Sequence, residues 1–296
     1  MTAGRRLAAL LAPLCLIGAL PAAASTFMPV TKTCPIGGEK FSFNEQMSSS
    51  SWGRLPDGMA LGTGPNPGLL PQCPKNGLVM YRDFDAATVK RLEPLVASKE
   101  YQALRSSETS YYRAWWLANR LGDDDAPWIM LTATWEAKNA DPASAQARRY
   151  AEAFIAQVRA LPVANTVDSV ALRARAANAL REIGDFAGAE ALRAAIAIAP
   201  DMGGGSQDAI DNRKGWAGFL AELAGPIARG DASRGPVDMM SDREAARRCL
   251  EPRVKRGAGD RPAVPLTAFE KDYCARPKLA DEIKQFSDIL GDRLSS

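Results

Sequence analysis

The chain has 296 residues, of which 46% are hydrophobic and 24% are charged, a composition typical of a globular protein with a sizeable core. The formal net charge is +3, and Arg5 and Arg6 contribute two of the positive charges. Without its first residues the chain is therefore nearly neutral. This argues against a nucleic acid or an anionic membrane as a partner held by bulk charge.

The N-terminus has the pattern of a secretory signal peptide. Arg5 and Arg6 precede an apolar run at residues 7–20, and small residues at 21–24 resemble a cleavage site. The run has about 14 residues, whereas a membrane-spanning helix needs roughly 20. We therefore expect residues 1–24 to be removed after Ala24 and the mature chain to be exported to the periplasm. The alternative is a signal retained as an anchor.

Four cysteines remain once Cys15 is lost with the signal: Cys34, Cys73, Cys249 and Cys274. An even number of cysteines in an oxidising compartment indicates disulfides, with three possible connectivities. Proximity in the sequence favours Cys34–Cys73 and Cys249–Cys274. The second bridge would hold the C-terminal tail against the rest of the chain.

The segments "CPIGG" (34–38) and "CPKNG" (73–77) resemble the two halves of a zinc ribbon, C-P-x-C-G, with Gly37 and Asn76 in place of the second cysteines. Thiolates that share a tetrahedral zinc lie roughly 3.7 Å apart, so the remaining pair needs little movement to form a disulfide. We predict that a disulfide has replaced the metal and that no cofactor is bound. The alternatives are a zinc site completed by Glu39, and ordinary proline-glycine turns joined by a structural disulfide.

The pattern continues beyond these two turns, with Phe41 after the first, Asn66-Pro67-Gly68-Leu69 between them, and Asp83-Phe84 after the second. In these features residues 30–140 resemble a family of bacterial proteins of unknown function, whose zinc ribbon precedes helices similar to tetratricopeptide repeats. The resemblance implies a fold, but it gives no information on activity because the family has no established one. Gly37 and Asn76 depart from the family's pattern, which leaves two of the four cysteine ligands of the ribbon.

The predicted domains are a β-rich cap at residues 25–85, a helical body at 86–229 and a loop-rich C-terminal segment at 230–296. Within the cap we expect a strand at residues 78–84 and a glycine-rich loop at 48–64. The fold class is therefore mainly α with a small β-rich cap.

Helical periodicity begins near residue 86 and predicts a helix interrupted near Pro94. A helix ending near residue 121 has Ser107, Glu108 and Thr109 as candidate caps, and another spans residues 126–140. The next begins with Asp141 as its expected N-cap. A further helix should span residues 211–228.

Residues 170–200 are similar to one tetratricopeptide repeat. The features that support this are Leu180 in the first helix, Gly184 at the turn, Phe186 at the start of the second helix, Ala189 at the helix contact and Pro200 at the end. We expect two to three such helix pairs stacked as a short solenoid. In the C-terminal segment, a short helix and a final amphipathic helix near residues 279–294 are expected.

The chain contains no histidine, which excludes Ser-His-Asp and Cys-His nucleophilic sites and the H-E-x-x-H metalloprotease motif. No G-x-x-x-x-G-K-[ST] phosphate loop and no C-x-x-C redox motif occur. Acidic residues at 123–125, 136 and 152 are candidates for a glycosidase-like carboxylate pair. We interpret them instead as solvated turn and helix-surface residues.

Six aromatic residues gather in residues 111–135: Tyr111, Tyr112, Trp115, Trp116, Trp128 and Trp135. Neighbouring residues on a helix point about 100° apart, so Trp115 and Trp116 cannot both face one interior. We predict that Tyr112, Trp115 and Trp128 are packed inside. Trp116, Tyr111 and Trp135 are then the predicted contacts to a partner.

These patterns favour a non-catalytic periplasmic protein that binds an unidentified protein or peptide through its helical body. The alternative is a carboxylate-dependent hydrolase of cell-envelope glycans on the same helical scaffold. Two acidic groups about 5–10 Å apart in one cleft would distinguish the alternative.

Overall fold

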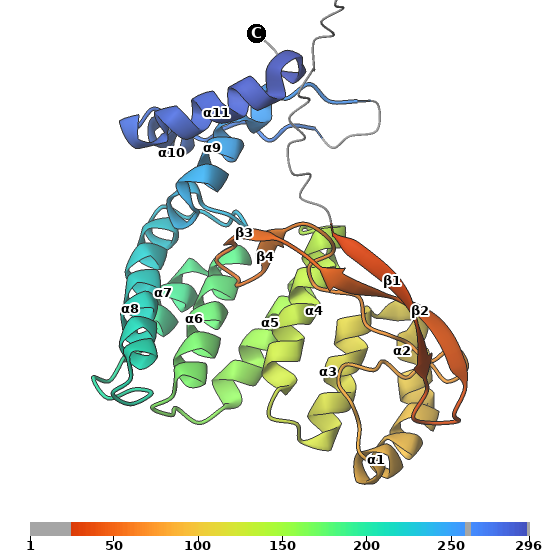
Figure 1. Cartoon of the computed structure of the whole chain (residues 1–296). Coiled ribbons are helices and arrows are strands. Elements are labelled where there is room, and N and C mark those ends of the chain that lie inside the picture. The colour runs from red at the N-terminus through yellow and green to blue at the C-terminus, as the bar shows by residue number, and fades with distance from the viewer. Residues whose placement is uncertain (1–24, 258–261, 295–296) are drawn as a thin grey trace, which may run out of the picture.

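The computed structural model describes residues 25–257 and 262–294, so the predicted signal peptide lies outside the described residues. The protein is mainly helical, with a small β region at the N-terminal end of the described chain (Figure 1). The predicted fold class, a helical body with a small β-rich cap, is therefore confirmed.

The β region consists of two antiparallel hairpins. Strands β1 (Thr26–Thr33) and β2 (Lys40–Ser48) form the first, and β3 (Ser51–Arg54) and β4 (Ala60–Gly62) form the second. The loop expected at residues 48–64 was therefore wrong in part. Gly62 allows this second pairing, because a Cβ there would lie 2.3 Å from the Ser50 carbonyl oxygen.

The strand predicted at residues 78–84 is absent from the described structure, where this segment forms one isolated bridge, between Gln72 and Val79. A tyrosine takes over the backbone hydrogen bonds that a neighbouring strand would make. The Tyr101 hydroxyl accepts from the Val79 N–H at 3.2 Å and donates to the Gly77 carbonyl at 2.8 Å. Leu78 in this segment is buried in a core cluster formed mostly by helix residues, among them Leu92, Tyr101 and Leu117.

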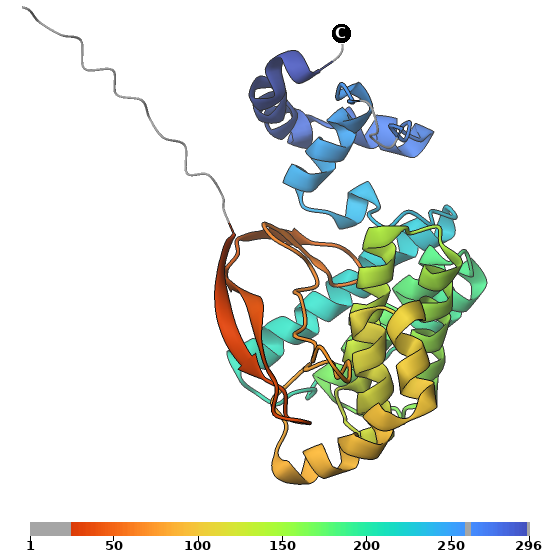
Figure 2. The ribbon, with the colours of Figure 1, turned by 90° about the vertical axis from the view of Figure 1, so that its right-hand side faces the viewer.

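The helical body is a row of helices, each of which packs against its neighbour in the chain from α3 to α7 (Figure 1). Figure 2 shows the β1–β2 hairpin as an outer layer beside these helices. The bounds are α1 (Ala86–Ala97), α2 (Lys99–Ser107), α3 (Ser110–Leu121), α4 (Ala126–Ala140), α5 (Ala145–Ala160), α6 (Val167–Glu182), α7 (Phe186–Ala194) and α8 (Gln207–Ala228).

The helix boundaries correct two expectations. Pro94 lies inside α1, and the interruption comes at Ser98, which leaves the helical conformation and caps α2 through its hydroxyl. Ser144, and not Asp141, caps α5, because Asp141 instead accepts from the Ala143 N–H in the preceding turn. Thr109 is the one of the three candidates that caps α3.

The predicted helix pair at residues 170–200 is present as α6 and α7. Leu180 and Ala189 are both buried in the main core, which explains the need for a small residue where the two helices meet. Gly184, two residues after the end of α6, adopts a left-handed φ of 85°, and Asp185 caps α7. The second helix ends at Ala194, several residues before the expected terminator.

The C-terminal segment forms a group of short helices with its own small core, and lies beyond the end of α8 in Figure 1. The helices are α9 (Asp242–Leu250), α10 (Ala268–Cys274) and α11 (Ala280–Leu290), with the 3₁₀ turns η1 (Val237–Met239), η2 (Glu251–Arg253), η3 (Pro277–Leu279) and η4 (Gly291–Arg293). Over the described ranges, the helices are all too short or too polar to traverse a bilayer.

Candidate functional site

Both predicted cysteine pairs lie at bonding distance, Cys34 with Cys73 and Cys249 with Cys274. The first bridge joins the two C-P-x-x-G turns, which share one hydrogen-bond pattern. In each turn the cysteine N–H donates to the carbonyl five residues later, and the glycine N–H four residues later donates to the cysteine carbonyl. The two turns are thus structural copies of one another.

Asn76 joins the two turns where a zinc ribbon would have a cysteine. Its side-chain amide donates to the Ile36 carbonyl in the opposite turn at 3.0 Å, and its oxygen accepts from the Leu78 N–H at 2.9 Å. The ligand atoms of Cys34, Glu39 and Cys73 lie within 4.8 Å of one another. Sulfurs bonded to each other lack the thiolate charge that binds a metal, so this geometry favours the disulfide.

A segment of the cap, residues 55–72, begins with the turn between β3 and β4, lies against the helical body and is held by side chains of three helices. Each of the four contacts is a side-chain donor to a backbone carbonyl: Arg175 to Pro56, Trp135 to Asp57, Asn139 to Asn66, and Tyr111 to Gly68. Tyr111 and Trp135, predicted as contacts to an external partner, here contact the chain's own segment. Burial raises the pKa of the Tyr111 hydroxyl to about 12.

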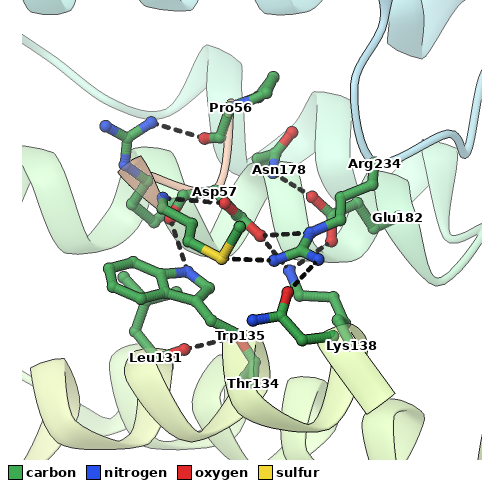
Figure 3. Close-up of polar contacts among 12 residues, drawn as sticks. Pro56, Asp57, Leu131, Thr134, Trp135, Lys138, Asn178, Glu182 and Arg234 are labelled. Carbon is green, nitrogen blue, oxygen red and sulfur yellow. Dashed lines mark hydrogen bonds and ion pairs between the residues drawn. The ribbon is translucent and has the colours of Figure 1, made fainter. Parts of the chain in front are cut away.

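A cluster of buried charges anchors the same segment, and Figure 3 shows it in close-up. Lys138 Nζ on α4 lies 2.5 Å from Asp57 Oδ2 and 2.8 Å from Glu182 Oε2 on α6. Arg234, from the C-terminal segment, places its Nε 3.3 Å from the same Asp57 oxygen. The Asp57 side chain is 3% exposed, so its charge is neutralised within the protein. The ion cluster, Asp57, Lys138, Glu182 and Arg234, therefore joins all three parts of the chain.

The cap aspartate of the ion cluster has a shifted pKa. Burial alone raises the pKa of Asp57, but the charges of Lys138 and Arg234 and the hydrogen bond from Lys138 outweigh it. The pKa of Asp57 therefore lies below its ordinary value of 3.8, and the group is a carboxylate at neutral pH.

Further polar groups orient the ion cluster. The Asn178 amide donates to Glu182 at 2.7 Å, and Arg234 donates to the Asn139 oxygen at 2.8 Å. Nearby, burial lowers the pKa of Arg175 to about 10, which leaves it charged at neutral pH. Such a fully paired network holds its members in one arrangement.

The ion cluster does bring two acids together, as the glycosidase alternative requires, because Asp57 and Glu182 flank one lysine. A general acid for glycoside cleavage needs a raised pKa, whereas the pKa of Asp57 is lowered. A cavity of about 250 Å³ reaches Lys138 and Glu182, but Asp57 does not line it. The geometry is therefore that of a structural ion cluster.

The predicted arrangement of the two adjacent tryptophans was wrong. Trp116 is only 4% exposed and packs against Tyr101, whereas Trp115 is half-buried and donates its indole N–H to Gln157 at 2.9 Å. The α1–α2 helices cover the face that was expected to be open. Trp116 is accordingly not part of the contact surface proposed below.

Three of the acidic residues considered from the sequence, Asp123, Glu136 and Glu152, have structural partners. Asp123 pairs with Arg82 at 3.0 Å, and Glu136 accepts from the Tyr111 N–H at 2.9 Å. Glu152 pairs with Arg148 one turn away on an exposed helix surface. Sequence analysis therefore did not identify the two acidic residues that share a partner, Asp57 and Glu182. Its only signal for Asp57 was a polar residue between apolar Leu55 and Met59 in what reads as an ordinary turn.

Fold and site define a mainly helical, disulfide-linked protein whose cap is anchored by an internal ion cluster. Comparison with protein-family models, with curated proteins and with solved structures finds no match to this chain.

Proposed function

We propose that this chain is an exported, non-catalytic scaffold that binds a protein or a peptide in the periplasm. The observation that supports this most strongly is the row of side-chain donors on α3, α4 and α6 that hold the backbone carbonyls of residues 55–72. Rigid helices that present donors to the backbone carbonyls of a non-helical segment are suited to peptide recognition. In this chain the cap occupies that surface, so the row of donors supports the ability of the helical body to hold a peptide backbone, and an external partner binds at another surface.

Two further observations support the compartment and the origin of the cap. The cysteine pairs at bonding distance fit an oxidising compartment, as does the signal-like N-terminus. The identical hydrogen-bond patterns of the two turns support the proposal that the cap descends from a zinc ribbon like that of the bacterial family described above. A disulfide and Asn76 then take over the role of the metal.

A glycan hydrolase is the less well supported alternative, because the meeting acids are clamped by cations. A hydrolase with this pair would need Asp57 or Glu182 to exchange protons with a substrate. Lys138 contacts both of them, and Asp57 has almost no exposed surface.

Export is tested by expressing the full chain in a Gram-negative host and measuring the intact mass of periplasmic material. We expect a chain that starts at Ser25 and is lighter by four hydrogens than the reduced form. Material with residues 1–24 retained, or with free thiols at positions 34 and 73, would contradict the proposal.

Binding is tested by immobilising oxidised residues 25–296 and offering periplasmic extract of the producing organism. We expect to capture a protein whose bound amount saturates as more extract is offered. An excess of this chain in solution should displace it, and the captured protein, when immobilised in turn, should bind this chain. The Glu152→Gln variant, altered at an exposed helix surface, serves as the control and should capture equally. Release of sugars from peptidoglycan that Asp57→Asn abolishes would instead favour the hydrolase.

A further inference from the structure

A cavity of about 720 Å³ lies where the C-terminal helices meet the second hairpin of the cap. It is lined by β3, α9, α11 and the turns beside them. The two parts approach closely here, since a Cβ placed on Gly53 of β3 would lie 3.8 Å from side-chain atoms of both Ser241 and Glu244. The volume is within the range of about 300–1,000 Å³ that is typical of ligand sites.

Large apolar side chains are open to solvent in this cavity. Trp52 is 37% exposed and Ile289 is 68% exposed, and Phe286 lies half-buried beside them. Single exposed apolar residues are common, but several that converge on one hollow mark a binding surface. The cavity therefore offers an apolar lining to an inserted side chain.

Arginines surround this apolar lining, and two of them have no acidic partner in the described ranges. Arg247 pairs with Glu244 at 3.1 Å and lies over the Trp52 ring. Arg243 lies over the Phe286 ring at 5.5 Å, and within residues 25–257 and 262–294 no carboxylate is at ion-pair distance from Arg243 or Arg293. The charged residues that line the cavity are four arginines and two glutamates, so the lining carries an excess of positive charge.

We propose that this cavity, the arginine pocket, binds a segment of a partner protein in which a large apolar side chain is flanked by carboxylates. The apolar lining receives the side chain, and Arg243 and Arg293 pair with the acids, a combination that gives both affinity and orientation. A hollow shape favours an inserted side chain over a flat anionic membrane. The proposal rests on the proposed function, because it assumes that the partner is a protein.

The test measures binding of oxidised residues 25–296 to an array of peptides, each with one large apolar residue flanked by aspartate and glutamate. Matched arrays carry asparagine and glutamine, or lysine, in place of the acids. We expect saturable binding to the acidic array that is at least about tenfold weaker for the amide array, absent for the lysine array, and weakened by salt. Equal binding to the three arrays, or binding to none, would overturn the proposal.

The double variant Arg243→Gln/Arg293→Gln should weaken binding to the acidic peptides by at least about tenfold. Both side chains are exposed and unpaired with acids, so the fold should be retained, which a thermal unfolding curve checks. Arg276→Gln is the matched control: Arg276 is exposed, lies over an aromatic ring at 4.3 Å in the same segment, and is outside the pocket. It should bind within about twofold of wild type.

Two outcomes separate this inference from the proposed function. If the double variant captures the periplasmic partner as strongly as wild type, the scaffold function stands and the arginine pocket is not its site. If vesicles of phosphatidylglycerol bind wild type in an arginine-dependent manner while the acidic peptides do not, the pocket recognises a membrane surface and the proposal is wrong.

Discussion

Asp57 shows how one residue links distant parts of this chain. Its carboxylate is buried between Lys138 of the body and Arg234 of the C-terminal segment, 81 and 177 residues away. Burying a charge is costly unless it is paired, so each of these groups depends on the others. Much of the stability that the contact between cap and body contributes should therefore depend on Asp57.

Replacing Asp57 by asparagine should lower the free energy of unfolding by about 3 kcal/mol, because it leaves the buried cations short of a counter-charge. Urea denaturation at neutral pH provides the measurement. Glu152→Gln, which breaks an exposed pair with Arg148, should change stability by less than about 1 kcal/mol. Equal changes in the free energy of unfolding for the two substitutions would show that the ion cluster contributes no more to stability than an exposed ion pair.

The pH dependence of the same variant follows from the lowered pKa of Asp57. The fold stabilises the ionised form, so this contribution is present above the ordinary pKa of 3.8 and is lost as the pH falls below it. The stability difference between wild type and Asp57→Asn should stay constant between pH 7 and pH 5 and shrink below about pH 4. A difference that grows on acidification would reverse the assigned direction of the shift.

At the scale of single elements, local sequence rules predicted much of the helical body. The turn at Gly184 and the small contact residue Ala189 are local features, and the structure has both where the pattern placed them. The strand expected at residues 78–84 failed because Tyr101, distant in the sequence, satisfies its backbone. The periodicity of apolar residues does not reveal that a side chain will make the backbone hydrogen bonds otherwise made by a neighbouring strand.

Two glycines of the body should respond to alanine in opposite directions. Gly184 has a left-handed φ of 85°, where a side chain is strained, so Gly184→Ala should destabilise by about 1–2 kcal/mol. Gly218 lies inside α8 with open space around it, so Gly218→Ala should stabilise by about 0.5–1 kcal/mol. Thermal unfolding of the two variants measures the sign of each stability change. Two changes of the same sign would contradict the assigned backbone conformations.

At the scale of the whole molecule, the cap lies on the body as an internal ligand. Composition and cysteine spacing predicted the fold class and both cysteine pairs, since these depend on local pattern and proximity. The ion cluster and the arginine pocket were not predicted, because each brings together residues more than 100 positions apart. The exposure of Trp116 was misjudged for a similar reason: α1 and α2 cover it, and the helix pattern around it does not specify which face is covered.

The central claim is that residues 55–59 are fixed on the helical body through Asp57, and amide hydrogen exchange of the oxidised protein tests it most directly. The Leu55 and Gly58 N–H groups donate to carbonyls within this buried turn. We expect their exchange to be as slow as that of α6 in wild type and much faster in Asp57→Asn, with the amides near Cys34 and Cys73 unchanged. Exchange of residues 55–59 in wild type as fast as in a free peptide would contradict the account.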